Sequence, residues 1–136
     1  MSIHKLQVQR FYRDLWENCD KAGIPEVLHS DFTFRGSLGY EKRGHGGFAD
    51  YVDMVHRALS NYRCFINDLV VEPPKVFARM TFQGTHMNEF RGFEGTGKTI
   101  SWDGAALFTF EGDKIWDVWV LGDLFNLEAT LKRNET

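Results

Sequence analysis

Asp123 is the residue whose type and position best suit acid–base chemistry. It follows an alternating apolar run at 114–121, and a straight strand would put it on one face with Asp117 and Trp119. A carboxylate in an apolar pocket loses solvation, which raises its pKa and lets it take an α-proton from a carbonyl compound. Asp123 also directly precedes a helical pattern, and a helix N-cap role would lower the same pKa. Both interpretations stay open.

His86 is the second candidate for a catalytic role. It lies on the same strand face as Met80, Phe82 and Gly84 in an alternating run. There it could donate a hydrogen bond to an enolate oxygen as negative charge develops. The alternative is a structural histidine bound to a backbone carbonyl beside a hairpin. No second ligand stands at helical or strand spacing from His86, so we expect no metal there.

Aromatic residues make up 15% of the chain, more than a small core needs, which indicates a pocket wall. Arg35 and Asp117 are polar residues near these rings; either could contact a ligand, although a structural ion pair between them is the simpler interpretation. The candidate ligand-binding residues are Trp119, Trp16, Trp102, Phe82, Phe34, Arg35 and Asp117.

A phosphate-binding pattern, G-x-x-x-x-G-K-[ST], is matched by residues 92–99. That motif works when a strand precedes the loop and a helix N-terminus follows it, because the helix directs its amides at phosphate. Here the next residues, 100–110, alternate like a strand. We therefore predict a glycine-rich hairpin loop and no nucleotide site.

These side chains must be positioned by helices followed by strands. The period of the apolar residues changes from 3.6 to 2 after Asn61, which predicts an α+β domain over residues 1–136 with helices on one face of an antiparallel sheet. Predicted helices cover 8–19, 48–59 and a segment opening after Asp123. Predicted strands cover 32–35, 64–72, 75–90, 99–110 and 114–121.

The composition indicates which binding partners and which cellular compartment to expect. A net charge of −3 without a basic run argues against nucleic acid and membranes as partners. The N-terminus has no apolar signal segment, and Cys19 and Cys64 match no disulfide or metal spacing, so we expect a cytoplasmic protein with reduced cysteines. The last strand is apolar on both faces, which predicts a homodimer through the sheet.

The segments Gly84–Gly92 and Thr96–Lys98, followed by Lys114–Trp119 and an Asp four residues after that Trp, resemble the SnoaL-like polyketide cyclase family. The resemblance covers nearly the whole chain, and the order and spacing of its motifs are specific. It implies a cone-shaped fold of the nuclear transport factor two type, with a curved sheet and N-terminal helices on its concave face.

The resemblance also implies a chemistry. Characterised cyclases of the family close a ring by aldol condensation without metal or cofactor. It assigns acid–base catalysis to Asp123, helped by His86, on a small apolar or polycyclic carbonyl compound. A related isomerisation, activated-water hydrolysis of an epoxide or ester, and non-catalytic ligand binding are the alternatives. One departure is Gly122, where a bulky residue is common, and it predicts a wider pocket near Asp123.

Overall fold

A computed structural model describes residues 2–135 of the chain. Its helices are α1 (Ile3–Arg10), the π-helical η1 (Phe11–Glu17), the short η2 (Lys21–Gly23) and α2 (Ile24–Val27), α3 (Gly44–Ala58) and α4 (Leu124–Asn134). Its strands are β1 (Leu28–Arg35), β2 (Glu41–Arg43), β3 (Leu59–Glu72), β4 (Lys75–His86), β5 (Thr99–Glu111) and β6 (Lys114–Gly122). The predicted α+β class is confirmed. The predicted strands are present, and β2 is an addition within the glycine-rich segment after β1.

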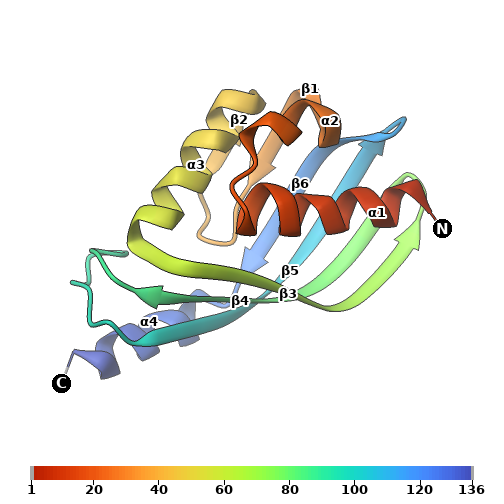
Figure 1. The fold of residues 1–136 in the computed structure, drawn as a ribbon. Helices are drawn as coiled ribbons and strands as arrows, with labels where there is room; N and C mark the ends of the chain where they lie inside the picture. The colour runs from red at the N-terminus through yellow and green to blue at the C-terminus, as the bar shows by residue number, and fades with distance from the viewer. Residues whose placement is uncertain (1, 136) are drawn as a thin grey trace.

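All six strands form one sheet in the order β2-β1-β6-β5-β4-β3. From β3 to β6 the strands form an antiparallel meander, as the alternating patterns predict. β1 pairs with β6 in parallel, with Phe34 opposite Val118. The parallel pairing departs from the antiparallel sheet that the sequence predicts, because no hairpin signal joins two strands so far apart in the chain. The sheet curves around the helices α1 and α3, which lie on one of its faces (Figure 1).

The N-terminal helix forms because its apolar residues recur at helical spacing and its start is capped. The Ser2 hydroxyl accepts hydrogen bonds from the amides of His4 and Lys5 at 3.1 and 3.4 Å. The predicted single helix changes to a π-helix at Phe11. The rings of Phe11, Tyr12 and Trp16 are all buried on this stretch.

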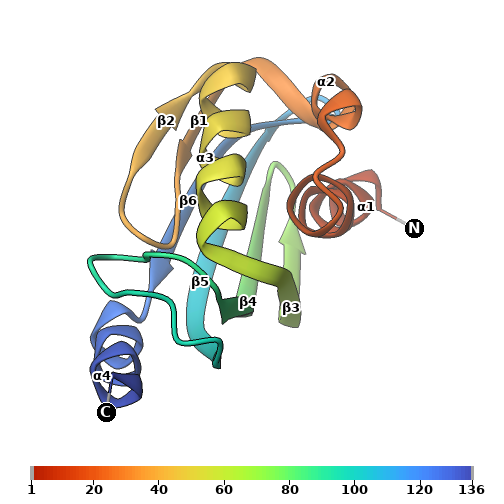
Figure 2. The same ribbon diagram turned by 60° about the vertical axis from the view of Figure 1, so that its left-hand side comes forward.

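The concave face of the sheet is covered by aromatic packing. Phe34 of β1 contacts the rings of Phe48 and Tyr51 on α3, with centroids 5.4 and 5.2 Å apart. Phe108 of β5 meets Phe11 edge-on at 5.4 Å. These contacts join the N-terminal helix, α3 and the sheet into one core. α4 lies apart from α1 and α3, next to the loop between β4 and β5 (Figure 2).

A β-bulge at Trp116 changes which residues of β6 face the core. Phe110 pairs with Ile115, whereas Thr109 pairs with Asp117, so Trp116 is one extra residue on β6. Beyond the bulge the alternation is shifted: Val118 is buried, and Trp119 is 44% exposed. The prediction that Ile115 shares a face with Asp117 and Trp119 was therefore wrong.

Gly122 ends β6 in a tight place rather than an open one. A Cβ atom built at this glycine would overlap the carbonyl oxygen of Ser37. This is a backbone atom, so moving it away would cost free energy. The missing side chain allows the loop after β1 to pack against the end of β6. The extra room predicted from Gly122 is thus not present.

We expect Gly122→Ala to lower the free energy of unfolding by about 1–3 kcal/mol, because the new methyl group must displace backbone. Gly46→Ala is the matched control: it lies in α3 with open space around a built Cβ, and we expect it to be neutral or stabilising by about 0.5–1 kcal/mol. Urea unfolding measures both. Equal stability of the Gly122 variant and the wild type would contradict this packing.

Candidate functional site

An aromatic cavity lies between the helices and the concave face of the sheet. Eight of its lining residues are aromatic, four from the helical side and four from the sheet: Phe11, Tyr12, Trp16 and Tyr51, and Phe34, Tyr62, Phe82 and Trp102. The volume open to the centre of a water-sized sphere is about 20 Å³. A single water needs roughly 10–15 Å³ by this measure. The closed cavity therefore holds about one water, and a ring compound enters only if side chains move.

Two tyrosine hydroxyls give this apolar cavity its chemistry. The hydroxyls of Tyr12 and Tyr51 are buried, and within residues 2–135 neither has a hydrogen-bond partner; the backbone of Leu38 lies close enough to Tyr51 to affect its pKa. Burial raises the pKa of Tyr12 well above its ordinary value. Burial also raises the pKa of Tyr51, partly offset by the Leu38 backbone and by Arg35 and Arg91. Both groups therefore stay protonated and can donate to a carbonyl oxygen.

Four of the predicted ligand-binding residues meet in this cavity: Trp16, Trp102, Phe82 and Phe34. Their rings come from η1, β5, β4 and β1. The Trp102 indole donates weakly to the Ser37 hydroxyl at 3.4 Å. Tyr12 and Tyr51 were missed as site residues because their helical spacing marked them as core, and sequence spacing does not show whether a buried hydroxyl has a partner.

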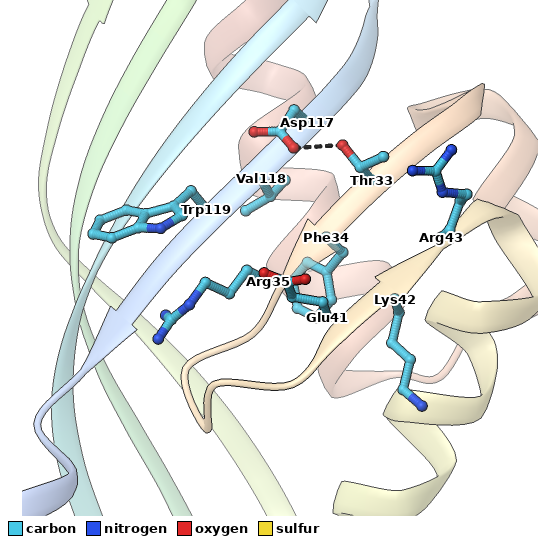
Figure 3. Close-up of a pocket in the computed structure, with 9 residues that line it drawn as sticks. All are labelled: Thr33, Phe34, Arg35, Glu41, Lys42, Arg43, Asp117, Val118 and Trp119. Atoms are coloured by element: carbon cyan, nitrogen blue, oxygen red, sulfur yellow. Dashed lines mark hydrogen bonds between the residues drawn. The ribbon is translucent and has the colours of Figure 1, made fainter.

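The other three predicted ligand-binding residues, Trp119, Arg35 and Asp117, do not line the cavity. They border a hollow on the opposite face of the sheet, lined by β1, β2 and β6 (Figure 3). The expected ion pair is replaced by other partners: Asp117 accepts from the Thr33 hydroxyl at 2.5 Å, and Arg35 donates to the Val120 carbonyl. The Arg35 guanidinium lies over the Trp119 ring, 5.6 Å from its centroid. The bulge at Trp116 is the physical reason that Asp117 and Trp119 lie here. Arg35 lies here because it alternates along β1 with Phe34, which faces the cavity.

His86 is fully buried under the loop between β4 and β5. Its Nε2 lies 3.0 Å from the carbonyl oxygen of Phe93, so this nitrogen carries the proton in the neutral tautomer. Its Nδ1 is buried without a partner. His86 therefore makes the backbone hydrogen bond expected of a structural histidine, and its Nδ1 remains available to accept a hydrogen bond from a ligand.

Asp123 is the N-cap of α4. Its carboxylate accepts from the amide of Asn126 at 3.2 Å and from the Asn126 side chain at 2.6 Å. These hydrogen bonds lower the pKa of Asp123 below its ordinary value. In this structure Asp123 therefore caps α4, as the second interpretation predicted. The raised pKa expected inside an apolar pocket is absent, because the group is solvated and doubly hydrogen-bonded.

Comparisons with known proteins agree with the fold and with the motifs. The family model described as SnoaL-like polyketide cyclase matches residues 6–131. The chain belongs to this family. A search of curated protein sequences found no match.

Solved structures share the fold of this SnoaL-like chain. A presumed polyketide cyclase from Acidithiobacillus ferrooxidans has a TM-score of 0.87 at 20% identity, over 98% of this chain and 96% of that one. TsrD from Streptomyces laurentii has a TM-score of 0.82 at 22% identity, over 95% and 94%. A Catenulispora acidiphila protein of ketosteroid isomerase-like fold, crystallised with trimethylamine, has a TM-score of 0.76 at 13% identity, over 93% and 92%. The predicted cone-shaped fold of the nuclear transport factor two type is confirmed.

The glycine-rich segment at 92–99 is a loop in this SnoaL-like fold. It leads directly into β5 at Thr99, and no helix follows it to direct amides at phosphate. In the described residues 2–135, no group of three or more His, Cys, Asp or Glu side chains could hold a metal ion. Over the same residues, no helix is long and apolar enough to cross a membrane.

We expect Asp123→Ala to lower the melting temperature by a few degrees through loss of the cap, while Asp123→Asn keeps it, because Asn caps as well as Asp. The folded pKa of Asp123 is lowered, so its stabilisation is present above about pH 5 and is lost as pH falls from about 4 through the folded pKa. The loss at low pH should be smaller in the Asn variant.

Melting curves at pH 7 and pH 3 measure these differences. Asp50→Ala is the control, since Asp50 is an exposed acid within α3. Equal melting temperatures of the wild type and the Asp123→Ala variant at pH 7 would show that the cap does not stabilise α4.

Proposed function

We propose that this protein is a cyclase- or isomerase-type enzyme that binds a flat, apolar carbonyl compound in the aromatic cavity and holds its carbonyl oxygen on the hydroxyls of Tyr12 and Tyr51. The observation that carries the proposal is that both hydroxyls are buried without a partner among apolar rings. An unpaired buried donor costs free energy. A ligand that combines rings with an acceptor oxygen removes this cost.

The hydroxyls suit an acid role in such chemistry. When an α-proton leaves a carbonyl compound, negative charge develops on the oxygen, and donors fixed in an apolar site stabilise it. Since burial raises the pKa of both tyrosines, they remain donors through the physiological range. A hydrocarbon of the same shape would lack this interaction.

The family resemblance assigns the proton transfer itself to Asp123 and His86, and we retain both as proposals. Asp123 would have to release the Asn126 side chain to act as a base. His86 would contribute its free Nδ1 only after the loop around Phe90 moves, since the two rings now lie 6.2 Å apart in a buried contact. No metal or cofactor enters this proposal.

Ligand binding without turnover is the second candidate function. It is favoured by the capping role of Asp123 and by the lowered pKa of its carboxyl, because a base stabilised as its anion takes up protons poorly. In this case the tyrosines bind the carbonyl oxygen and no bond changes. Both functions use the same cavity, so the test must separate binding from proton transfer.

We expect the wild type to bind 2-acetylnaphthalene at least about tenfold more tightly than 2-ethylnaphthalene, and Tyr12→Phe to reduce this ratio severalfold. Apo Tyr12→Phe should be as stable as the wild type or more stable, because the unpaired hydroxyl is gone. Quenching of tryptophan fluorescence measures binding, and urea unfolding measures stability. A ratio unchanged by both Tyr12→Phe and Tyr51→Phe would refute the role of the hydroxyls.

Proton exchange then separates the enzyme from the binder. An enzyme should accelerate exchange of the methyl protons of 2-acetylnaphthalene in D₂O, followed by NMR, and Asp123→Asn should slow it while binding persists. Binding without acceleration would favour the second candidate function. Unchanged exchange in Asp123→Asn would show that Asp123 is a cap only.

We also propose that the chain forms a homodimer through the outer face of the sheet. Four apolar side chains lie in register across that face and are each more than a third exposed: Val70, Phe77, Leu107 and Trp119. A second copy would cover this row, which we call the outer apolar row. The cytoplasmic location stays a prediction, supported by the two free cysteines.

We expect Trp119→Glu to convert a dimer into a monomer in sedimentation experiments, because it puts a charge within the covered outer apolar row. Phe125→Glu is the control, since Phe125 is 84% exposed on α4 and is outside the outer apolar row. A monomeric wild type at about 100 μM, or equal dissociation of both variants, would contradict this interface.

A further inference from the structure

A second, open hollow adjoins the aromatic cavity at the loop after β1. The volume of this hollow is about 410 Å³, whereas that of the aromatic cavity is about 20 Å³. Leu38 lines both spaces, so the two spaces meet at this residue. Phe90 also lines the hollow, and its ring lies 6.0 Å from that of Trp102, which lines the cavity. We call this space the outer hollow; a ligand that reaches the cavity past Leu38 must cross it.

Arg91 lies in the outer hollow on a tight turn that does not favour arginine. The amide of Phe90 donates to the carbonyl of Phe93 at 2.9 Å, and the amide of Phe93 donates back at 3.0 Å. The two residues between them, Arg91 and Gly92, have φ values of +54° and +87°. Consecutive positive φ values favour Asn-Gly and disfavour long side chains. The arginine therefore carries a conformational cost that its backbone position does not explain.

The Arg91 side chain is not neutralised by a neighbour. Its Nε is buried and has no hydrogen-bond partner among the residues that the structure describes. No carboxylate within residues 2–135 forms an ion pair with it by a 4.0 Å limit. Glu89, the acid in the same hollow, is held by the Gly92 amide at 2.6 Å. A guanidinium with a free buried donor is a binding group for a carboxylate.

The same guanidinium is within electrostatic reach of the cavity. Its charge lowers the pKa of Tyr51, against the larger opposite effect of burial. Arg91 and the Tyr51 hydroxyl therefore lie toward the same end of the site, where Leu38 borders both spaces. One ligand could contact both.

We propose that the outer hollow is an anion subsite in which Arg91 binds a carboxylate of the ligand, while the apolar rings of that ligand enter the aromatic cavity. The proposal rests on the proposed function, since it assumes that the cavity takes the rings. The expected substrates are aromatic or polycyclic carbonyl compounds that carry an acidic group at one end. A neutral compound of the same shape would lose the contact with Arg91.

The test compares 2-naphthoate with 2-naphthamide, which have the same shape and differ in charge. We expect the wild type to bind the carboxylate about tenfold more tightly. Arg91→Asn removes the guanidinium and puts the favoured residue on the turn, so it should bring the ratio close to one while leaving the stability unchanged or higher. Lys98→Gln is the charge-matched control, because Lys98 is exposed on the same loop and is not among the residues that line the hollow.

Titration calorimetry and urea unfolding give the two readouts. A carboxylate preference that survives in Arg91→Asn, or that falls equally in Lys98→Gln, would overturn the anion subsite. A wild type that binds both compounds equally, with binding weakened by Phe82→Ala in the cavity, would overturn the subsite and leave the proposed function standing. Binding of neither compound would overturn both. A Tyr12→Phe variant that keeps the carboxylate preference would show that the subsite acts independently of the hydroxyls.

Discussion

The packing of aromatic rings around Phe34 joins the layers of this fold. Its ring contacts Phe11 and Trp16 from the N-terminal helix and Phe48 and Tyr51 from α3, with centroids 5.2–6.3 Å apart. Aromatic pairs at these separations contribute beyond the area they bury. Because the rings nearly fill the concave face, they leave a cavity with room for only about one water, and the buried tyrosine hydroxyls border it.

The same aromatic packing determines how strongly groups in the cavity can act on a ligand. An apolar cavity strengthens the effect of each donor on a ligand oxygen, which is what an enolising or cyclising site requires. It also raises the free energy of the empty state, because the hydroxyls of Tyr12 and Tyr51 are buried and gain no protein partner within residues 2–135. The carboxylate assigned to the reaction by family resemblance lies outside this cavity, where solvent and Asn126 hold it as an anion.

The sheet presents two surfaces that differ in what covers them. Its inner face packs on the helices, whereas its outer face exposes the apolar row that includes Leu107 and Trp119. The extra residue at Trp116 decides which side chains of β6 belong to which surface. One bulge therefore moves Trp119 and Asp117 from the expected pocket to the face on which we propose the dimer.

The sequence alone determined the fold class, the element order and half of the aromatic residues that line the cavity. These follow from local periodicity, which places Trp16, Phe34, Phe82 and Trp102 on apolar faces whatever the detailed packing. The resemblance of the motifs to the family implied the same fold.

Tertiary structure decided the rest, because it depends on contacts between residues distant in the chain. These are the parallel pairing of β1 with β6, the tight contact of Gly122 with Ser37 and the unpaired groups of Tyr12, Tyr51 and Arg91. A bulge shifts alternation without a local signal, and whether a buried polar atom has a partner is a property of the assembled fold.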